Sequence, residues 1–339
     1  MTRFFILILC VVAGTGVRAQ TLGGATVFNF LRNSTTPQLS ALGGINVSQL
    51  HNDVAMGFHQ PAFYVPSMHG QASFNFQTGL SGVKQYHASG VWYDKKRDIT
   101  FAGGLQFFDY GAFRQTTEAG IELGEIRPTD YVLQVSASRA YMDRWRYGLT
   151  LKWIQSSYGQ YRSNGLALDA GLTYTDTAKK WRAGILLRNM GTQLRVYQGS
   201  SRAGLPFDIQ AGISKRLMHA PLQFSATLHH LHQFNIQYAD TTTDGALSTA
   251  GGFTDKLFRH VVIAAQLFVE ERIELSIGYN YLRRKELNIG SSGNGLNGFS
   301  IGMGLHLRNF QFRYSRAWFQ QNQSIHQLGL NLSLSRPFR

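Results

Sequence analysis

Apolar and polar residues alternate along the C-terminal third of the chain. In 328–335 every second residue is leucine, and the residues between are glycine, asparagine or serine. The same period of two recurs in 310–318 and in 299–308. Successive side chains of a strand point to opposite faces, so each segment predicts a strand with one apolar face. Strands of soluble sandwiches usually have about five or six residues, whereas about 9 to 11 are needed to cross a bilayer at a tilt. The lengths therefore predict membrane-spanning strands.

The alternation begins near Met68 and predicts about fourteen strands in all. The eleven strands before the three described above are centred on 72–76, 84–93, 99–108, 131–135, 145–153, 166–174, 181–187, 207–213, 222–228, 261–269 and 273–281. The prediction is an all-β fold, a transmembrane antiparallel β-barrel of about 14 strands over residues 68–339.

The connections between these strands differ in length according to their parity. The even-numbered connections are short turns, at 94–97, 142–143, 176–179, 218–220, 270–271 and 308–309. The odd-numbered ones include the long stretches 109–130, 190–206, 233–256 and 284–297, and we expect only the first and last of them to be short. A bacterial barrel with both termini in the periplasm has short periplasmic turns and longer outer loops. In a soluble sandwich, no such difference between odd- and even-numbered connections is expected.

Residues 1–19 have the pattern of a secretory signal peptide. Arg3 precedes the apolar run Phe4–Val12, and the small-residue stretch that follows ends at Ala19. Lipidation at Cys10 is the less favoured alternative, because Leu9 is larger than the small residue usual before a lipidated cysteine. The mature chain then has no cysteine, which excludes a disulfide framework, a thiol nucleophile and a thiolate metal site.

Residues 20–67 do not alternate. They combine glycine pairs with a helix-like spacing of Leu39, Leu42 and Ile45. We predict that this segment forms a compact plug, or hatch, at the periplasmic mouth of the barrel. A disordered leader is the alternative.

The composition agrees with a barrel that faces lipid on one side and its own lumen on the other. After the signal there is no apolar run of about 20 residues, so only a closed barrel is able to span the membrane. The net charge of +14, of which Arg3 and Arg18 contribute two, indicates an anionic surface or partner. For an exported chain, lipopolysaccharide phosphates or an acidic protein fit this charge better than nucleic acid.

Candidate chemistry is sparse. His229, His230 and His232 form the densest cluster of potential ligands, and His230 and His232 share a strand face. No carboxylate lies at a useful local spacing, so an ordinary polar strand end is favoured over a metal site. There is no Gly-x-Ser-x-Gly elbow of an outer-membrane lipase, and the glycine-rich segment 290–295 fits a flexible loop better than a phosphate cradle. We expect no catalytic residue, metal or cofactor.

Charged residues also occur at predicted lumen-facing positions. They either pair and hold the wall rigid or line a path for an anionic solute, and the structural role is the commoner. These residues are Arg144, Arg146, Lys152, Asp169, Arg182, Asp208, Glu274 and Arg313.

The N-terminal segment carries a combination of apolar residues, a glycine pair, an aspartate and a Pro-Ala pair. These motif residues are Phe28, Phe30, Leu31, Ala41, Leu42, Gly43, Gly44, Asp53, Pro61 and Ala62. The combination resembles the PorQ family of outer-membrane proteins of the type IX secretion system. The resemblance extends through the C-terminal strands and so covers most of the mature chain. The family usually has Asn before its Pro-Ala pair, where this chain has Gln60.

The resemblance implies a fold similar to FadL, a fourteen-stranded barrel with an N-terminal hatch. It implies a non-catalytic role in which the barrel anchors a PorZ-like surface protein. With PorV and the sortase PorU, such proteins form the complex that matures secreted cargo and attaches it to anionic lipopolysaccharide. The working surface is then the outer loops, especially 110–129 and 233–256. The candidate partner-binding residues are Phe113, Arg114, Glu118, Phe234, Tyr238 and Phe253.

A FadL-type transporter of hydrophobic small molecules is the competing hypothesis. Such a protein needs an apolar pocket behind the hatch and a lateral gap in the wall. Phe108 and Phe268 lie on the otherwise polar strand face, where they either line such a pocket or pack against the plug.

Overall fold

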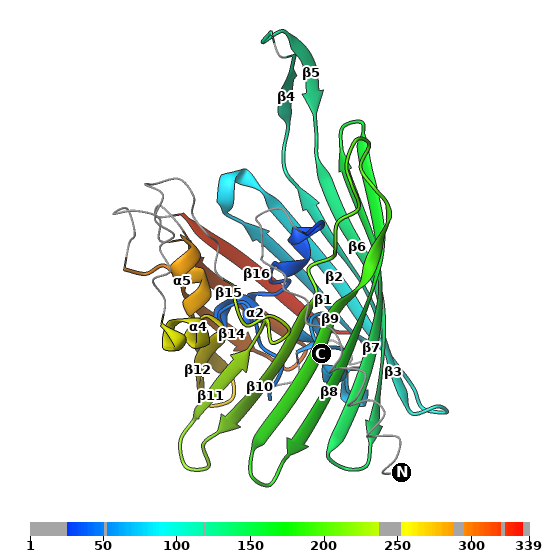
Figure 1. Cartoon of the computed structure of the whole chain (residues 1–339). Coiled ribbons are helices and arrows are strands. Elements are labelled where there is room, and N and C mark those ends of the chain that lie inside the picture. The colour runs from blue at the N-terminus through cyan, green and yellow to red at the C-terminus, as the bar shows by residue number, and fades with distance from the viewer. Residues whose placement is uncertain are drawn as a thin grey trace, which may run out of the picture.

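The computed structural model describes residues 26–50, 53–117, 119–236, 252–287, 295–319 and 323–334. The predicted signal peptide, Glu118 and Tyr238 lie outside these ranges. Within them, fourteen antiparallel strands form a closed barrel (Figure 1), which confirms the predicted fold class. Each strand pairs with its neighbour in the chain, except that β3 pairs with β6 and that β1 pairs with β16 to close the barrel.

The barrel strands agree closely with the alternating segments of the sequence. They are β1 (Gln71–Thr78), β2 (Lys84–Asp94), β3 (Ile99–Asp109), β6 (Thr129–Tyr141), β7 (Trp145–Tyr158), β8 (Tyr161–Asp176), β9 (Trp181–Arg195), β10 (Asp208–Arg216), β11 (Leu222–Leu228), β12 (Val261–Val269), β13 (Ile273–Asn280), β14 (Phe299–His306), β15 (Phe310–Trp318) and β16 (Ser324–Ser333).

The apolar face of each strand points outward. On β7, Leu149 and Leu151 are 50% and 57% exposed, whereas Thr150 and Lys152 are buried inside the barrel. In a soluble protein the apolar face of a strand is buried and the polar face is exposed. The opposite arrangement here is the one that a surrounding hydrocarbon layer requires. The chain is therefore an outer-membrane β-barrel. In the part of the chain that the structure describes, no helix has the length and apolar character needed to cross a membrane.

The connections at the two ends of the barrel differ as expected, with one exception. The short turns at the lower end of Figure 1 mark the periplasmic side. At the outer end, the connection between β7 and β8 was expected to be long, but it is a tight turn between Tyr158 and Tyr161. The expectation was wrong because these strands run for 14 and 16 residues, well beyond the apolar stretches that revealed them.

Three of the long outer connections carry structure of their own. The connection from β3 to β6 contains a two-stranded hairpin, β4 (Phe113–Thr116) and β5 (Glu122–Ile126), which projects beyond the barrel at the top of Figure 1. The connections after β11 and β13 contain the helices α4 (Phe253–Arg259) and α5 (Tyr281–Leu287), which lie against each other.

The described part of the N-terminal segment fills the lumen. It comprises η1 (Asn29–Arg32), α2 (Pro37–Ala41), α3 (Val54–Gly57), η2 (Pro61–Phe63) and η3 (Pro66–Met68). It starts near the outer mouth, where Val27 N donates to Gly204 O at 2.9 Å, and ends at the periplasmic side, where Gly70 N donates to Val91 O at 3.0 Å. The plug was predicted at the periplasmic mouth, but its described residues extend from the outer mouth to the periplasmic side of the lumen.

Candidate functional site

A buried network of charged groups joins the plug to the barrel wall. Arg313 of β15 contacts Glu274 of β13 through Nη1 and Oε2 at 2.9 Å, and Asp53 of the plug through Nε and Oδ2 at 3.2 Å. Gln38 of α2 donates to Glu274 Oε1 at 2.5 Å. Asn331 of β16 donates to Asp53 Oδ1 at 2.8 Å. All five side chains are buried, so the network ties two plug helices to three strands.

Asp53 has two roles in this network. Its Oδ1 also accepts the backbone N–H of Ala55 at 2.9 Å, and so it caps the first turn of α3. A carboxylate at a helix N-terminus satisfies N–H groups that have no partner within the helix. The same side chain therefore shapes the plug and fastens it to the wall.

A second ion pair lies inside the wall. Lys152 Nζ and Asp169 Oδ2 are 2.5 Å apart, and both side chains are almost completely buried. Asp169 Oδ1 accepts the backbone N–H of Asn189 at 2.7 Å, at the point where the register of β8 and β9 shifts. The carboxylate therefore accepts a hydrogen bond from the N–H of Asn189, which the register shift leaves without a backbone partner on β8.

The remaining lumen-facing charges mostly hold the plug. Arg188 donates to Leu31 O at 2.7 Å, and Arg146 donates to Tyr64 O at 3.3 Å. Arg182 donates a short hydrogen bond to Gln49 O. Arg144 was expected in the lumen, but it lies on the periplasmic turn before β7 with its side chain 58% exposed and pairs with Asp176 at 3.7 Å. These contacts favour the structural role of the charges over a solute path.

Apolar contacts hold the outer half of the plug. Phe28, Phe30 and Leu31 of the family motif form a buried cluster with five residues of the wall and of the loop before β10, namely Phe108, Val132, Ile154, Ala167 and Leu205. The ring centroids of Phe30 and Phe108 are 5.3 Å apart in an edge-to-face arrangement. Phe108 therefore packs against the plug. The other candidate for an apolar pocket, Phe268, lies under the guanidinium of Arg216 at 4.6 Å.

The other motif residues lie along the middle and lower plug. Leu42 packs with Met56 and Phe63. Gly43 and Gly44 have φ values of +87° and +90°, a left-handed conformation that favours glycine, and they turn the chain after α2.

Inward-facing glycines of the wall admit the plug backbone. A Cβ at Gly278 of β13 would lie 2.5 Å from Ala41 O, and a Cβ at Gly148 of β7 would lie 2.5 Å from the carbonyl carbon of Pro61. Only glycine allows so close an approach. This accounts for Ala41, Pro61 and Ala62 of the motif, whose backbone or side chain touches the wall at such positions. Glycine at inward strand positions is the sequence signal that could have located these contacts.

His59 is completely buried between plug and wall. Its Nε2 lies 3.1 Å from Gln210 Oε1 of β10. Burial, together with the nearby charges of Arg188 and Lys152, lowers the pKa of His59 well below its ordinary value of 6.5. The imidazole is therefore neutral at physiological pH.

A cavity of about 450 Å³ lies at the outer mouth, between the plug and the loops that carry α4 and α5. Its polar lining includes Arg32, His229, His230, Arg283 and Glu286. Its apolar lining comes from the plug, the loops and the outer ends of β15 and β16. Arg283 also donates to Gly43 O at 3.2 Å. Burial lowers the pKa of Arg283 to about 10, so the guanidinium keeps its charge at neutral pH.

The candidate partner-binding residues fall into two separate groups. Phe113 and Arg114 lie on β4 of the projecting hairpin, where Arg114 pairs with Glu122 at 2.9 Å. Phe234 and Phe253 lie at the mouth, with ring centroids 5.8 Å apart. The structure therefore does not bring all four together.

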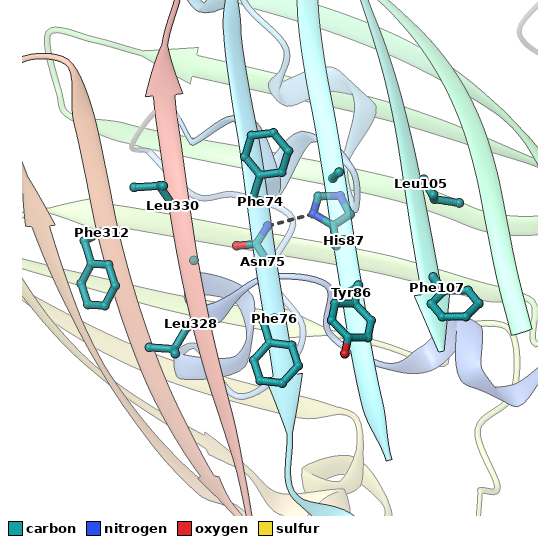
Figure 2. Close-up of a pocket in the computed structure, with 12 residues that line it drawn as sticks. Phe74, Asn75, Phe76, Tyr86, His87, Leu105, Phe107, Phe312, Leu328 and Leu330 are labelled. Carbon is teal, nitrogen blue, oxygen red and sulfur yellow. Dashed lines mark hydrogen bonds between the residues drawn. The ribbon is translucent and has the colours of Figure 1, made fainter. Parts of the chain in front are cut away.

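An apolar hollow of about 370 Å³ lies on the lipid-facing surface of the wall. Figure 2 shows its floor, across β15, β16, β1, β2 and β3, and the dashed contact of Asn75 Nδ2 with His87 Nδ1 at 2.8 Å. Asn75 and His87 belong to the inward faces of β1 and β2, where both are buried and His87 packs against Phe58 of the plug. The apolar lining side chains belong to the outward faces of the strands, so they contact acyl chains of the bilayer rather than the lumen. The main apolar residues are Phe74, Phe76, Leu105, Phe107, Phe312, Leu328 and Leu330.

Comparison with known proteins identifies the fold. No protein-family model matches the chain, and no curated protein matches it in sequence. Among solved structures, it is similar to the Pseudomonas putida toluene transporter TodX, with a TM-score of 0.53 and 12% identity over 88% of this chain and 97% of that one.

Two further structures agree. The CymD monoaromatic hydrocarbon channel gives a TM-score of 0.52 at 14% identity, over 91% of this chain and 99% of the channel. A Pseudomonas aeruginosa FadL homologue gives a TM-score of 0.51 at 9% identity, over 89% of this chain and 98% of the homologue. At these identities the similarity establishes a FadL-like outer-membrane barrel fold.

Proposed function

We propose that this chain is a non-catalytic outer-membrane anchor that holds a surface protein, as the motif resemblance to the type IX attachment complex implies. The observation that carries the proposal is the projecting β4–β5 hairpin. Phe113, Ile121 and Leu123 on it are 51%, 64% and 61% exposed. Exposed apolar side chains on a projecting element are typical of a protein-binding surface. The partner in this proposal is a PorZ-like protein, with PorV-like and PorU-like proteins and anionic lipopolysaccharide in the wider complex.

The plug supports a static role for the barrel. It is fastened by the network of Arg313, Glu274 and Asp53 and by the outer aromatic cluster around Phe30. These contacts oppose displacement of the plug, because moving Asp53 away breaks a buried ion pair and opens the packed aromatic cluster. An anchor needs this rigidity, because a fixed barrel presents its outer surface in one geometry.

Transport of hydrophobic small molecules is the second candidate, and the structural comparisons favour it more directly than the first. The similar structures are described as hydrocarbon channels or transporters. In this candidate the substrate enters through the cavity at the outer mouth, and the plug has to move. The apolar cluster of Phe28, Phe30 and Phe108 then has to open toward that cavity.

A pull-down from native outer membranes in mild detergent separates the two candidates. The wild-type barrel is compared with a variant in which Phe113, Ile121 and Leu123 are replaced by serine. Leu194→Ser is the matched control, because Leu194 is an exposed leucine near the outer end of β9. The anchor predicts that a PorZ-like surface protein is recovered with wild type and control but is lost with the triple variant.

Uptake of toluene into liposomes that contain the purified barrel completes the experiment. An anchor leaves uptake at the level of empty liposomes. Recovery of the barrel without a surface protein, together with barrel-dependent uptake, refutes the anchor and establishes the transporter.

A further inference from the structure

Three potential metal ligands meet at the outer end of β10 and β11. Asp208 is the first residue of β10, and His229 and His230 directly follow β11. One ligand atom from each residue lies within 4.8 Å of those of the other two. Asp208 is 21 positions away from His229 in the chain. The antiparallel pairing of β10 with β11 brings the carboxylate to the histidines.

The two imidazole rings face each other closely. His229 Nδ1 and His230 Nδ1 are 2.5 Å apart, which is shorter than a normal hydrogen bond. A neutral imidazole has one N–H donor and one nitrogen lone pair. One of the two nitrogens therefore carries the N–H that the other accepts. A metal ion replaces this hydrogen and moves the two nitrogens apart, because Zn–N bonds of about 2.0–2.1 Å in tetrahedral geometry hold them farther from each other. His229 is fully buried, and its Nε2 has no hydrogen-bond partner in the described structure.

The backbone at His230 is held in an unusual conformation. Its φ is +54°, in the left-handed region, and its N–H donates to Asp208 Oδ1 at 2.6 Å. Residues held in this region often occur at binding sites, where the surrounding structure fixes them. Here the turn directs the residue toward Asp208 and His229.

Neighbouring groups hold the side chain of Asp208 and the backbone of His229. Gln210 donates to Asp208 Oδ2 at 2.7 Å, and His260 Nδ1 lies 2.8 Å from His229 O. Such contacts position metal ligands in known sites. Arg32 and Arg283 line the same cavity, and their charges oppose a cation. The Asp208 carboxylate offsets part of this repulsion.

We propose that Asp208, His229 and His230 bind a divalent cation of the zinc class. Two imidazoles and one carboxylate are a ligand set that Zn²⁺ commonly uses, with a fourth position left for water. The bound ion joins the end of β10 to that of β11 and fixes the base of the outer loop that carries α4. This site is independent of whether the barrel anchors a protein or transports a solute.

The test uses the full barrel in detergent, stripped with a chelator and titrated with Co²⁺ as a spectroscopic probe. We expect one equivalent of Co²⁺ per chain with visible absorption bands, and competition by Zn²⁺. His230→Ala and Asp208→Asn should lose the bands. His219→Ala should keep them, because His219 is an exposed histidine on a periplasmic turn. Heat-modified gel mobility checks that each variant forms a barrel.

Limited trypsin digestion of the wild type gives a second readout that needs no variant. Cleavage after Lys256 and Arg259 of α4 reports on the loop base. If cleavage requires the metal-free state, Zn²⁺ at ten times its Kd slows it by about tenfold. A wild-type barrel that shows neither stoichiometric Co²⁺ bands nor Zn²⁺-dependent protection overturns the proposal, as do equal bands in wild type and folded His230→Ala.

Discussion

Replacement of Arg313 by methionine tests whether the charged network holds the plug. Arg313 is almost fully buried and is the cation shared by Glu274 and Asp53. Methionine keeps much of the side-chain volume but leaves two carboxylates buried beside each other. Removal of one partner from a buried ion pair costs about 3–5 kcal/mol. Because about 1.4 kcal/mol is a factor of ten, the population with a displaced plug should rise by about two to three and a half powers of ten.

The assay is the rate at which a maleimide labels a cysteine placed at Val54. This residue is buried beside Asp53 in α3, and the only cysteine of the sequence, Cys10, lies in the predicted signal peptide. When opening is fast relative to labelling, the rate follows the population of the open form. We therefore expect the Arg313→Met barrel to be labelled about a hundredfold faster than the wild type, or more.

Two controls sharpen this experiment. Arg316→Met removes the same charge from the same strand, but Arg316 contacts Ser324 and Trp318 rather than the plug, so labelling should stay at the wild-type rate. Adding Glu274→Gln and Asp53→Asn to Arg313→Met removes the unpaired carboxylates, and labelling should return toward the wild-type rate. If Arg313→Met is labelled no faster than Arg316→Met, the network does not hold the plug and the reasoning is refuted.

Three further predictions concern the packing and protonation of the plug. Gly278→Ala should speed labelling of the cysteine at position 54, because the new Cβ would lie 2.5 Å from Ala41 O. Gly103→Ala should not, since the atom nearest to its new Cβ would be 4.0 Å away. Equal labelling rates for the two variants would show that the close packing at Gly278 does not hold the plug. Phe30→Ala should lower the stability of the folded barrel in urea titrations by about 3–5 kcal/mol, and a loss below about 1 kcal/mol would show that the outer cluster is not packed. The pKa of His59 is lower in the folded than in the unfolded chain, so the folded plug is favoured above pH 6.5 and loses stability as the pH falls below it. The labelling rate, divided at each pH by that of a free thiol to correct for the thiolate fraction, should therefore rise as the pH falls from 7.5 to 5.5. A His59→Gln variant with the same corrected pH dependence would refute this assignment.

The strands were predictable because their signal is local. On β16, Leu328 and Leu330 face lipid while Gly329 and Asn331 face the lumen, and this alternation can be read without knowing any partner. The tight turn at Tyr158 was missed because polar residues extend β7 and β8 beyond the bilayer, where alternation no longer marks a strand.

The contacts of the lumen were not predictable because they join distant positions. Asp53 pairs with Arg313, which lies 260 positions later in the chain. A lumen-facing charge in the sequence does not show whether it contacts the plug or lines a solute path. The expectation that the histidine cluster lacked a carboxylate followed from local spacing alone. Pairing of β10 with β11 supplies Asp208, which only the strand register reveals.

The free energy that holds the plug in place also determines how strongly a transported solute has to favour the open form. If the open form lies about 3 kcal/mol or more above the closed form, it is populated at about 1% or less in the absence of ligand. A solute increases that population only if it binds the open form more tightly than the closed form by a corresponding factor. Transport therefore predicts that toluene accelerates labelling of the cysteine at position 54. An anchor predicts no effect of toluene at any concentration that leaves the barrel folded, so one reporter distinguishes the two candidates.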